Sequence, residues 1–221
     1  MTKFLERTKA IQLRKAGKSY SEIKGLVKVS KSSLSLWLRN IHLTEDQVQR
    51  LKQTKEKAVE RFRNTMRLKR EKRLSNYYEI QKKRWLPLSN REFYLTGLFL
   101  YWGEGNKASR HTISISNTDP TLLKLSLLWM KNSLKIPEKA IRVCLQLYSD
   151  MDIDEAVDFW AKTLAISKNQ FNKPYIKFST RDLIDQKGFG HGTCNLVAHN
   201  TVIKENLMMA IRGIADFYTH R

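Results

Sequence analysis

The sequence of 221 residues predicts an α+β protein, with a basic all-helical front part followed by a mixed part of helices and strands. Helix-start signals and helical spacing of apolar residues dominate the first 85 positions. Beyond them, four stretches of alternating apolar and polar residues are separated by helical patterns, which is typical of an α+β domain. We therefore expect three parts, at residues 1–43, 44–86 and 87–221.

Charge follows the same division. The net charge is +20; residues 1–44 carry ten Lys/Arg and two acidic residues, and residues 45–84 carry fourteen and six. Such an excess on one part of a chain indicates a polyanionic partner, and nucleic acid is the commonest one. A solvated basic helix face without a partner is the alternative interpretation.

The first two predicted helices have clear ends. The first helix covers residues 4–16 and stops at Gly17, a residue suited to the position after a helix. Residues 19–22 read Ser-Tyr-Ser-Glu, which has the form of a capping box and begins the second helix. A turn at residues 28–29 follows the second helix.

A third helix is predicted from residue 31 to about residue 39, with Ser30 as its N-cap. This pattern resembles the helix-turn-helix of resolvases and small bacterial regulators. The resemblance implies that the third helix enters the major groove of double-stranded DNA. The residues expected to contact DNA are Ser30, Lys31, Ser32, Ser33, Ser35 and Arg39. A three-helix protein-binding module is the alternative.

Residues 44–47, Thr-Glu-Asp-Gln, form another capping-box start. One long basic helix is predicted from there to about Trp85, because no proline or glycine interrupts the stretch. Its apolar stripe is too weak for a coiled coil. The helix either lies along the phosphate backbone or acts as a spacer, and a solvated linker helix is the alternative.

Residues 87–90, Pro-Leu-Ser-Asn, mark the boundary of the back domain. A small antiparallel sheet is predicted, with helices covering one of its faces. The predicted helices are 91–104, 120–134, 152–164 and 202–218, and the predicted strands are 112–116, 141–148, 175–179 and 195–199. In the helix at 120–134, the buried positions are expected to be Leu122, Leu125, Leu128 and Trp129.

Alternation along the strands assigns two faces to this sheet. The core face is expected to carry Ile113, Ile115, Val143, Leu145, Leu147, Ile176, Phe178, Leu196 and Ala198. The opposite face is expected to carry Thr112, Ser114, Ser116, Arg142, Gln146, Tyr148, Tyr175, Lys177, Asn195 and His199. Such a polar, mildly cationic face can read base edges in a DNA groove. An ordinary solvated sheet face is the alternative.

The first helix of the back domain is apolar and aromatic, and it ends at Gly103-Glu104-Gly105. A carboxylate that follows directly on a buried stretch is expected to be desolvated. A desolvated acid at a helix end is a place where a divalent cation can be held.

Residues 95–98, Leu-Thr-Gly-Leu, together with residues 103–105, resemble the motif of LAGLIDADG homing endonucleases, and the likeness extends over residues 91–219. The resemblance implies a single-motif domain of the αββαββα type. It implies that Glu104 binds Mg²⁺ (or Mn²⁺). It also implies that Gly97 and Gly103 let the motif helix approach the same helix of a second copy. The spacing is longer than in the usual motif, and the final acid is Glu rather than Asp.

These features predict a homodimeric, Mg²⁺-dependent DNA endonuclease of the homing type, because one chain supplies only one principal carboxylate. The candidate catalytic residues are Glu104, Lys177 and Gln146, with Lys107 as a further candidate for contact with the phosphate. A transcriptional regulator that keeps the scaffold without cleaving DNA is the alternative.

Two cysteines without a CxxC pair, and no apolar run long enough to span a bilayer, predict a protein of the reducing cytoplasm. With DNA as the partner, we expect it to associate with the nucleoid and with no membrane.

Overall fold

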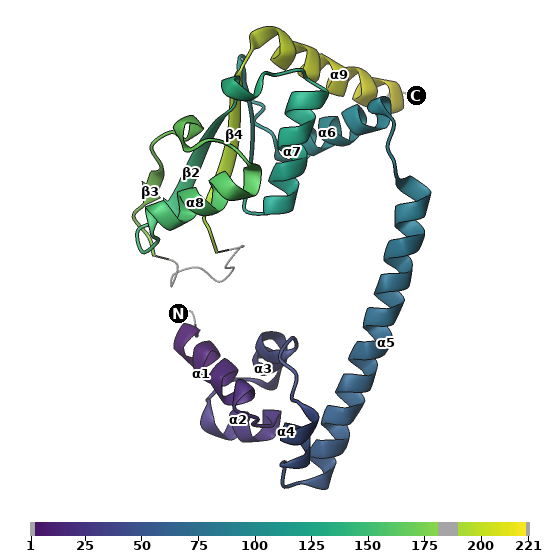
Figure 1. The fold of residues 1–221 in the computed structure, drawn as a ribbon, viewed down its shortest axis with the longest axis vertical. Coiled ribbons are helices and arrows are strands. Elements are labelled where there is room, and N and C mark those ends of the chain that lie inside the picture. Colours follow the sequence, from purple (N-terminus) through teal and green to yellow (C-terminus); the bar gives the residue numbers. More distant parts are fainter. Residues whose placement is uncertain (1–2, 181–189, 220–221) are drawn as a thin grey trace. The chain divides into compact units, whose positions relative to one another are not determined.

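The computed structural model describes residues 3–180 and 190–219, apart from the side chain of Thr54. The chain divides into two compact units, Met1–Leu86 and Pro87–Arg221, and each is described by itself (Figure 1). Among the described residues, no helix combines the length and the apolar character that crossing a bilayer requires.

The first unit begins with α1 (Phe4–Lys15), α2 (Tyr20–Leu26) and α3 (Lys31–Leu38). Their predicted starts and stops are confirmed. Gly17 has a φ of +92°, the left-handed conformation that ends a helix. Ser19 and Glu22 form the capping box of α2, and the Ser30 side chain accepts a hydrogen bond from the backbone N–H of Ser33. The three helices enclose a small core of Ala10, Ile23, Val27, Val29, Leu34 and Leu38.

The prediction of one helix from residue 44 to residue 85 is wrong at its start. Thr44 does form a capping box with Gln47, but the helix that it opens, α4, covers only Glu45–Gln49. A turn follows, and the long helix α5 covers Thr54–Trp85. Leu51 in this turn is 6% exposed and packs with Leu43 and Val48. The turn keeps Leu51 buried while it redirects the chain, so that α5 reaches α1.

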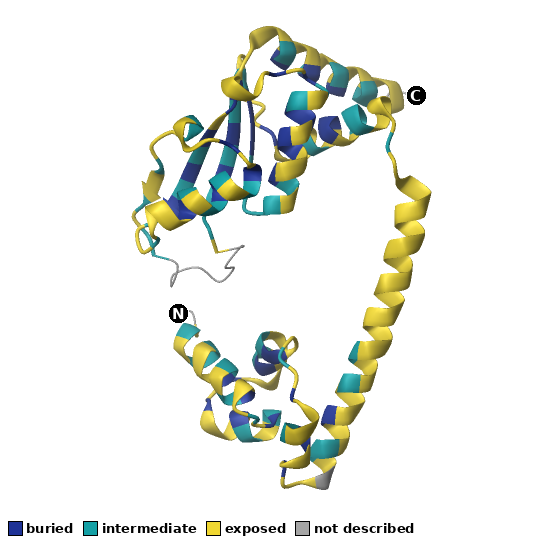
Figure 2. Cartoon of the chain, viewed as in Figure 1, coloured by how far each residue is buried: buried dark blue, intermediate teal, exposed yellow. Residues whose placement is uncertain are grey.

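A buried ion pair joins α5 to α1. The Arg14 guanidinium donates to both carboxylate oxygens of Glu60, at 2.6 and 3.3 Å, and the two side chains are only 2% and 6% exposed. One turn earlier on α5, Glu56 accepts a hydrogen bond from the Ser19 hydroxyl at 2.8 Å. Beyond residue 67, α5 is exposed on all sides (Figure 2). The first turns of α5 therefore belong to the three-helix body.

The second unit is a mixed domain of helices and strands, as the sequence predicts. Its order is α-β-α-β-α-β-β-α, which differs from the expected αββαββα order because a helix separates β1 from β2 and another separates β2 from β3. The elements are α6 (Asn90–Glu104), β1 (Thr112–Asn117), α7 (Pro120–Asn132), η1 (Glu138–Ala140), β2 (Arg142–Tyr148), α8 (Ile153–Leu164), η2 (Lys168–Gln170), β3 (Tyr175–Lys177), β4 (Thr193–His199) and α9 (Thr201–Thr219).

The described strands form one sheet in the order β1-β4-β2-β3. β4 pairs antiparallel with β1 and with β2, but β3 runs parallel to β2, so the expectation of a fully antiparallel sheet is wrong. The cause is the crossover through α8: a connection of this length returns the chain in its original direction, whereas a tight turn reverses it.

The core face of the sheet is as predicted in the three longer strands. Ile113, Ile115, Val143, Leu145, Leu147, Leu196 and Ala198 are all buried. The prediction fails at the edge strand, since Ile176 is 38% and Phe178 fully exposed. β3 is only three residues long, lies at the border of the sheet and ends before Phe178.

The buried face of α7 is also rotated from the prediction. Leu125 and Leu128 are 36% and 49% exposed, while Leu123, Leu127, Trp129 and Met130 are buried. Trp129 is fully buried, and its indole N–H donates to the Tyr94 carbonyl of α6 at 3.1 Å. This large ring sets which side of α7 faces inward.

Gly97 is a close-approach position, but it serves this chain rather than a second copy. A Cβ at Gly97 would lie 2.1 Å from the Trp129 ring. The expectation that Gly97 meets a symmetry-related helix is therefore corrected: glycine is needed where α6 crosses α7.

Gly97→Ala is expected to destabilise the second unit by about 1–3 kcal/mol or more, because a methyl group there overpacks the core and Trp129 cannot move away. Gly213→Ala in α9 is the matched control, since its Cβ would meet nothing within 4 Å. The control should change stability by no more than about 1 kcal/mol, in the stabilising direction. Urea denaturation of the two variants measures the difference, and equal midpoints would contradict this packing.

Candidate functional site

Glu104 is the last residue of α6 and is exposed, so the expectation of a desolvated carboxylate is wrong. The side-chain amide of Asn117, at the end of β1, donates to a carboxylate oxygen of Glu104 at 3.4 Å. Lys107 does not point to a separate phosphate site, because its Nζ donates to the Trp102 carbonyl at 2.8 Å and to the Gly103 carbonyl at 3.4 Å. Lys107 therefore caps the C-terminus of α6, beside Glu104.

A buried lysine fixes the turn that follows Glu104. The Lys204 side chain is 2% exposed, and its Nζ donates to the Tyr101 hydroxyl at 2.6 Å and to the Asn106 carbonyl. The Tyr101 hydroxyl donates to the same carbonyl at 2.5 Å. Burial raises the pKa of Tyr101 to about 12, and burial followed by the charge of Lys107 lowers the pKa of Lys204. Sequence analysis missed Lys204; its position among the apolar residues of an amphipathic helix was the available signal.

The other two predicted catalytic residues lie away from Glu104 within one chain. Gln146 is on β2 and Lys177 is on β3, and β4 separates both strands from β1. Since neighbouring strands lie about 4.8 Å apart, β1 and β3 are separated by roughly 14 Å. The Lys177 ammonium lies over the Tyr148 ring, 4.8 Å from its centre. Across residues 3–180 and 190–219, no group of three or more His, Cys, Asp or Glu side chains could hold a metal ion.

Strand pairing places the predicted polar residues on one face of the sheet. Thr112 pairs with His199, and Ser116 pairs with Asn195. Ser114 on β1 and Arg142 on β2 both pair with Val197 of β4, which lies between them. The same face continues along β2 and β3 through Gln146, Tyr148, Tyr175 and Lys177. Cys144, Thr193 and Val197, which the sequence analysis did not assign, lie on the same face. We call this set the polar sheet face.

The helices lie on the other side of the sheet. Buried side chains of α6, α7, α8 and α9 all join the core that contains the inward-facing strand residues. On the polar sheet face, Ser114 is only 5% exposed, so the expectation that its hydroxyl contacts DNA is wrong. At the centre of this face, the side-chain oxygen of Asn195 is buried and accepts no hydrogen bond from the described residues.

The predicted contact residues of α3 form two groups. Ser30, Ser32 and Ser33 lie together at its N-terminus, where the Ser30 hydroxyl is 2.9 Å from each of the other two. Lys31 is exposed in the same turn. Ser35 and Arg39 lie near the other end of α3, where they line a groove against α5.

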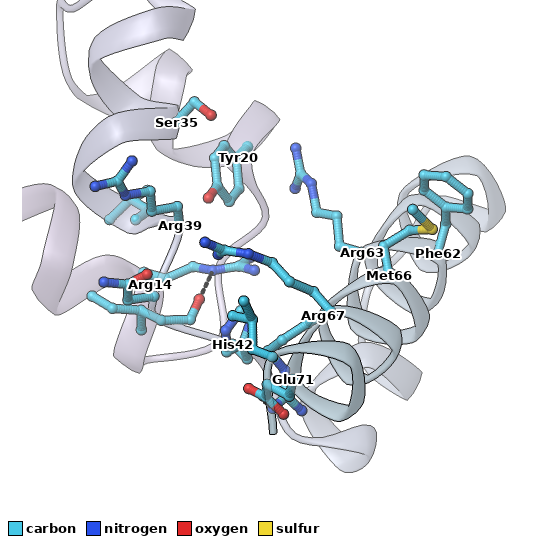
Figure 3. A pocket seen from close by; sticks show the side chains of 15 residues that line it. Arg14, Tyr20, Ser35, Arg39, His42, Phe62, Arg63, Met66, Arg67 and Glu71 are labelled. Carbon is cyan, nitrogen blue, oxygen red and sulfur yellow. Dashed lines mark hydrogen bonds and ion pairs between the residues drawn. The ribbon is translucent and has the colours of Figure 1, made fainter. Parts of the chain in front are cut away.

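This arginine groove has a volume of about 530 Å³ (Figure 3). Its polar lining includes Tyr20, Ser35, Arg39, Arg63, Arg67 and Arg70. In Figure 3, the side chains of Arg63 and Arg67 extend from α5 towards the three-helix body. Sequence analysis assigned Ser35 and Arg39 to DNA but missed the three arginines of α5, because nothing in the sequence says which side of that helix meets α3.

Comparison with protein-family models, with curated proteins and with solved structures finds no match for this chain.

Proposed function

We propose that this protein binds double-stranded DNA and cleaves it as a metal-dependent homodimer. The observation that carries the proposal is the position of Glu104, an exposed carboxylate at the end of α6 that accepts a hydrogen bond from Asn117 at the end of β1. The resemblance of α6 to the LAGLIDADG motif supports the same conclusion.

Two surfaces are suited to DNA. α3 presents serine hydroxyls and Lys31 at its N-terminus, the end that helix-turn-helix proteins direct at base edges. The polar sheet face carries hydroxyl, amide and cationic groups, which donate to and accept from base edges and phosphates. The excess of basic residues over the first 84 positions supplies the long-range attraction.

The donor atoms at Glu104 fit a hard divalent cation only in part. Its carboxylate and the Asn117 side chain are oxygen-bearing groups of the kind that Mg²⁺ prefers, but one carboxylate is too few for a phosphodiester-cleaving site. A second copy supplies the other carboxylate. Bound Mg²⁺ would lower the pKa of a water molecule and stabilise the leaving oxygen. The chain itself holds Glu104 in place through the Lys107 cap and the Lys204 hydrogen bonds.

The end of α6 is open to a second copy. Phe99 and Trp102 are 49% and 42% exposed, and their rings lie 6.0 Å apart. A Cβ at Gly103 would meet nothing within 4 Å. An exposed aromatic pair beside a glycine allows close packing of two helices, and it would place the two Glu104 side chains at the same end of the interface.

A DNA-binding regulator without nuclease activity is the second candidate. The observation that favours it is the separation of Gln146 and Lys177 from Glu104 across the sheet within one chain.

Incubation with a randomised duplex library, with and without Mg²⁺, distinguishes the two candidates. We expect retention of DNA in both conditions and scission only with Mg²⁺. Retention without scission under any divalent cation would favour the regulator, and the absence of retention would contradict both functions.

A further inference from the structure

We propose that the arginine groove binds a phosphodiester group of the DNA backbone, so that the first half of α5 and α3 both contact DNA. This inference rests on the proposed DNA binding and assigns to α5 a contact that the helix-turn-helix resemblance does not include.

The charge of the groove is strongly one-sided. Its lining contains five arginines, Arg14 among them, and a single acid, Glu71. Arg14 has a structural role, because its guanidinium donates hydrogen bonds to Glu60 and to the carbonyls of Lys18 and Ile41. The other four guanidiniums lie around an open volume of a size that accepts small ligands, which is roughly 300–1,000 Å³. Glu60 and Glu71 pair with Arg63 and Arg67, and the remaining positive charge favours an anionic ligand.

Two of these arginine side chains are already fixed in position by neighbouring residues. Arg63 donates to Glu60 at 2.7 Å, and its guanidinium lies 3.9 Å from the centre of the Tyr20 ring. Arg67 makes two 2.9 Å hydrogen bonds to Glu71 and two to Asn64. Side chains that are already fixed lose less conformational entropy when a ligand arrives. Planar guanidiniums also match the two oxygens of a phosphodiester.

Two further arginines keep their donors open. Arg39, near the end of α3, and Arg70, on α5, are exposed, and neither guanidinium has a hydrogen bond or ion pair with the described residues. Because α3 and α5 each contribute one of them, a phosphate between them would join the two helices to one DNA strand.

The local potential and the apolar lining are consistent with this ligand. Burial and then the charges of Arg67 and Arg14 lower the pKa of His42, which also lines the groove and faces Glu71 and Glu60. The exposed Phe62 and Met66 side chains of α5 line the groove next to the arginines. They offer apolar contact to the deoxyribose beside the phosphate.

The test compares Arg70→Gln with Lys72→Gln in the full chain. Lys72 is exposed on α5 two positions away and does not line the groove, so it is a matched control for the loss of one charge. Binding to a fluorescently labelled duplex of random sequence is measured by anisotropy over a salt series. Loss of one phosphate contact should reduce the steepness of log K against log salt by about 0.9 for Arg70→Gln, and Lys72→Gln should leave it unchanged.

If the wild-type chain binds with a steep salt dependence and the two variants have equal slopes, the proposed phosphate contact in the groove is contradicted, but DNA binding is not. A wild-type chain that does not bind, or binds without salt dependence, would overturn the proposed function itself. Arg39→Gln gives a second, independent measurement, because it removes the α3 side of the groove and should lower the slope by a similar amount.

Discussion

Glu104→Gln is expected to reduce Mg²⁺-dependent DNA cleavage by at least about 100-fold while DNA affinity stays within a factor of about two. In the proposed function Glu104 is the principal oxygen ligand of the metal ion, and even changes in groups that only support a metal ligand cost about 10–100-fold. Affinity is preserved because Glu104 is one exposed residue outside the basic surfaces. Single-turnover cleavage and anisotropy titration on the same duplex measure the two effects.

Glu205→Gln is the matched control for this experiment. Glu205 is an exposed carboxylate on α9, and the same change should leave cleavage unaltered. Cleavage that survives Glu104→Gln, or that falls equally in both variants, would mean that the metal site is elsewhere.

The largest expected effect on stability comes from the pair Arg14–Glu60. Removal of either partner, by Arg14→Met or Glu60→Gln, should lower the free energy of unfolding of the first unit by about 3–5 kcal/mol. The reason is that each change leaves the other charge inside a nearly closed site, where only 2% of Arg14 and 6% of Glu60 is exposed. Urea denaturation of the full chain, followed by helical circular dichroism, measures the loss in the transition of this unit.

The double variant isolates the coupling between these two residues. If the pair is the cause, Arg14→Met with Glu60→Gln should cost less than the sum of the single changes, by about 1–3 kcal/mol. Simple additivity would show that each side chain acts through other contacts, for example Glu60 through Arg63.

Local signals predicted the parts of the fold that local interactions determine. The capping boxes at Ser19 and Thr44 and the turn at Gly17 are all present, because a side chain within three residues satisfies the free backbone groups of a helix end. The same Ser-x-x-Glu signal at Ser89 begins α6, one position before the predicted start.

Interactions between distant residues were beyond the reach of the sequence. Arg14 and Glu60 are 46 positions apart, and nothing local marks either of them as buried. The burial of Phe178 was predicted by alternation alone, but whether an edge strand is covered depends on helices elsewhere in the chain. The parallel pairing of β3 likewise depends on the path of the crossover through α8.

The candidate site was predicted unevenly for the same reason. Glu104 was proposed from a compact motif, and the polar sheet face was predicted from the two-residue period of strands. The Lys204 and Tyr101 hydrogen bonds that fix the turn after Glu104 join α9 to α6 across the fold, and the arginine groove joins α5 to α3. Neither the Lys204 hydrogen bonds nor the arginine groove could be predicted without the structure.

The central claim is that two copies bring their Glu104 side chains together on DNA, and cross-linking tests it directly. The background chain carries Cys144→Ala, because Cys144 is partly exposed, and it keeps Cys194, which is buried. Glu104→Cys in this background is treated with a short bis-maleimide in the presence of duplex DNA. Glu205→Cys in the same background is the control. We predict a covalent dimer for Glu104→Cys and none for the control; a Glu104→Cys chain that binds DNA and stays monomeric would contradict the shared site.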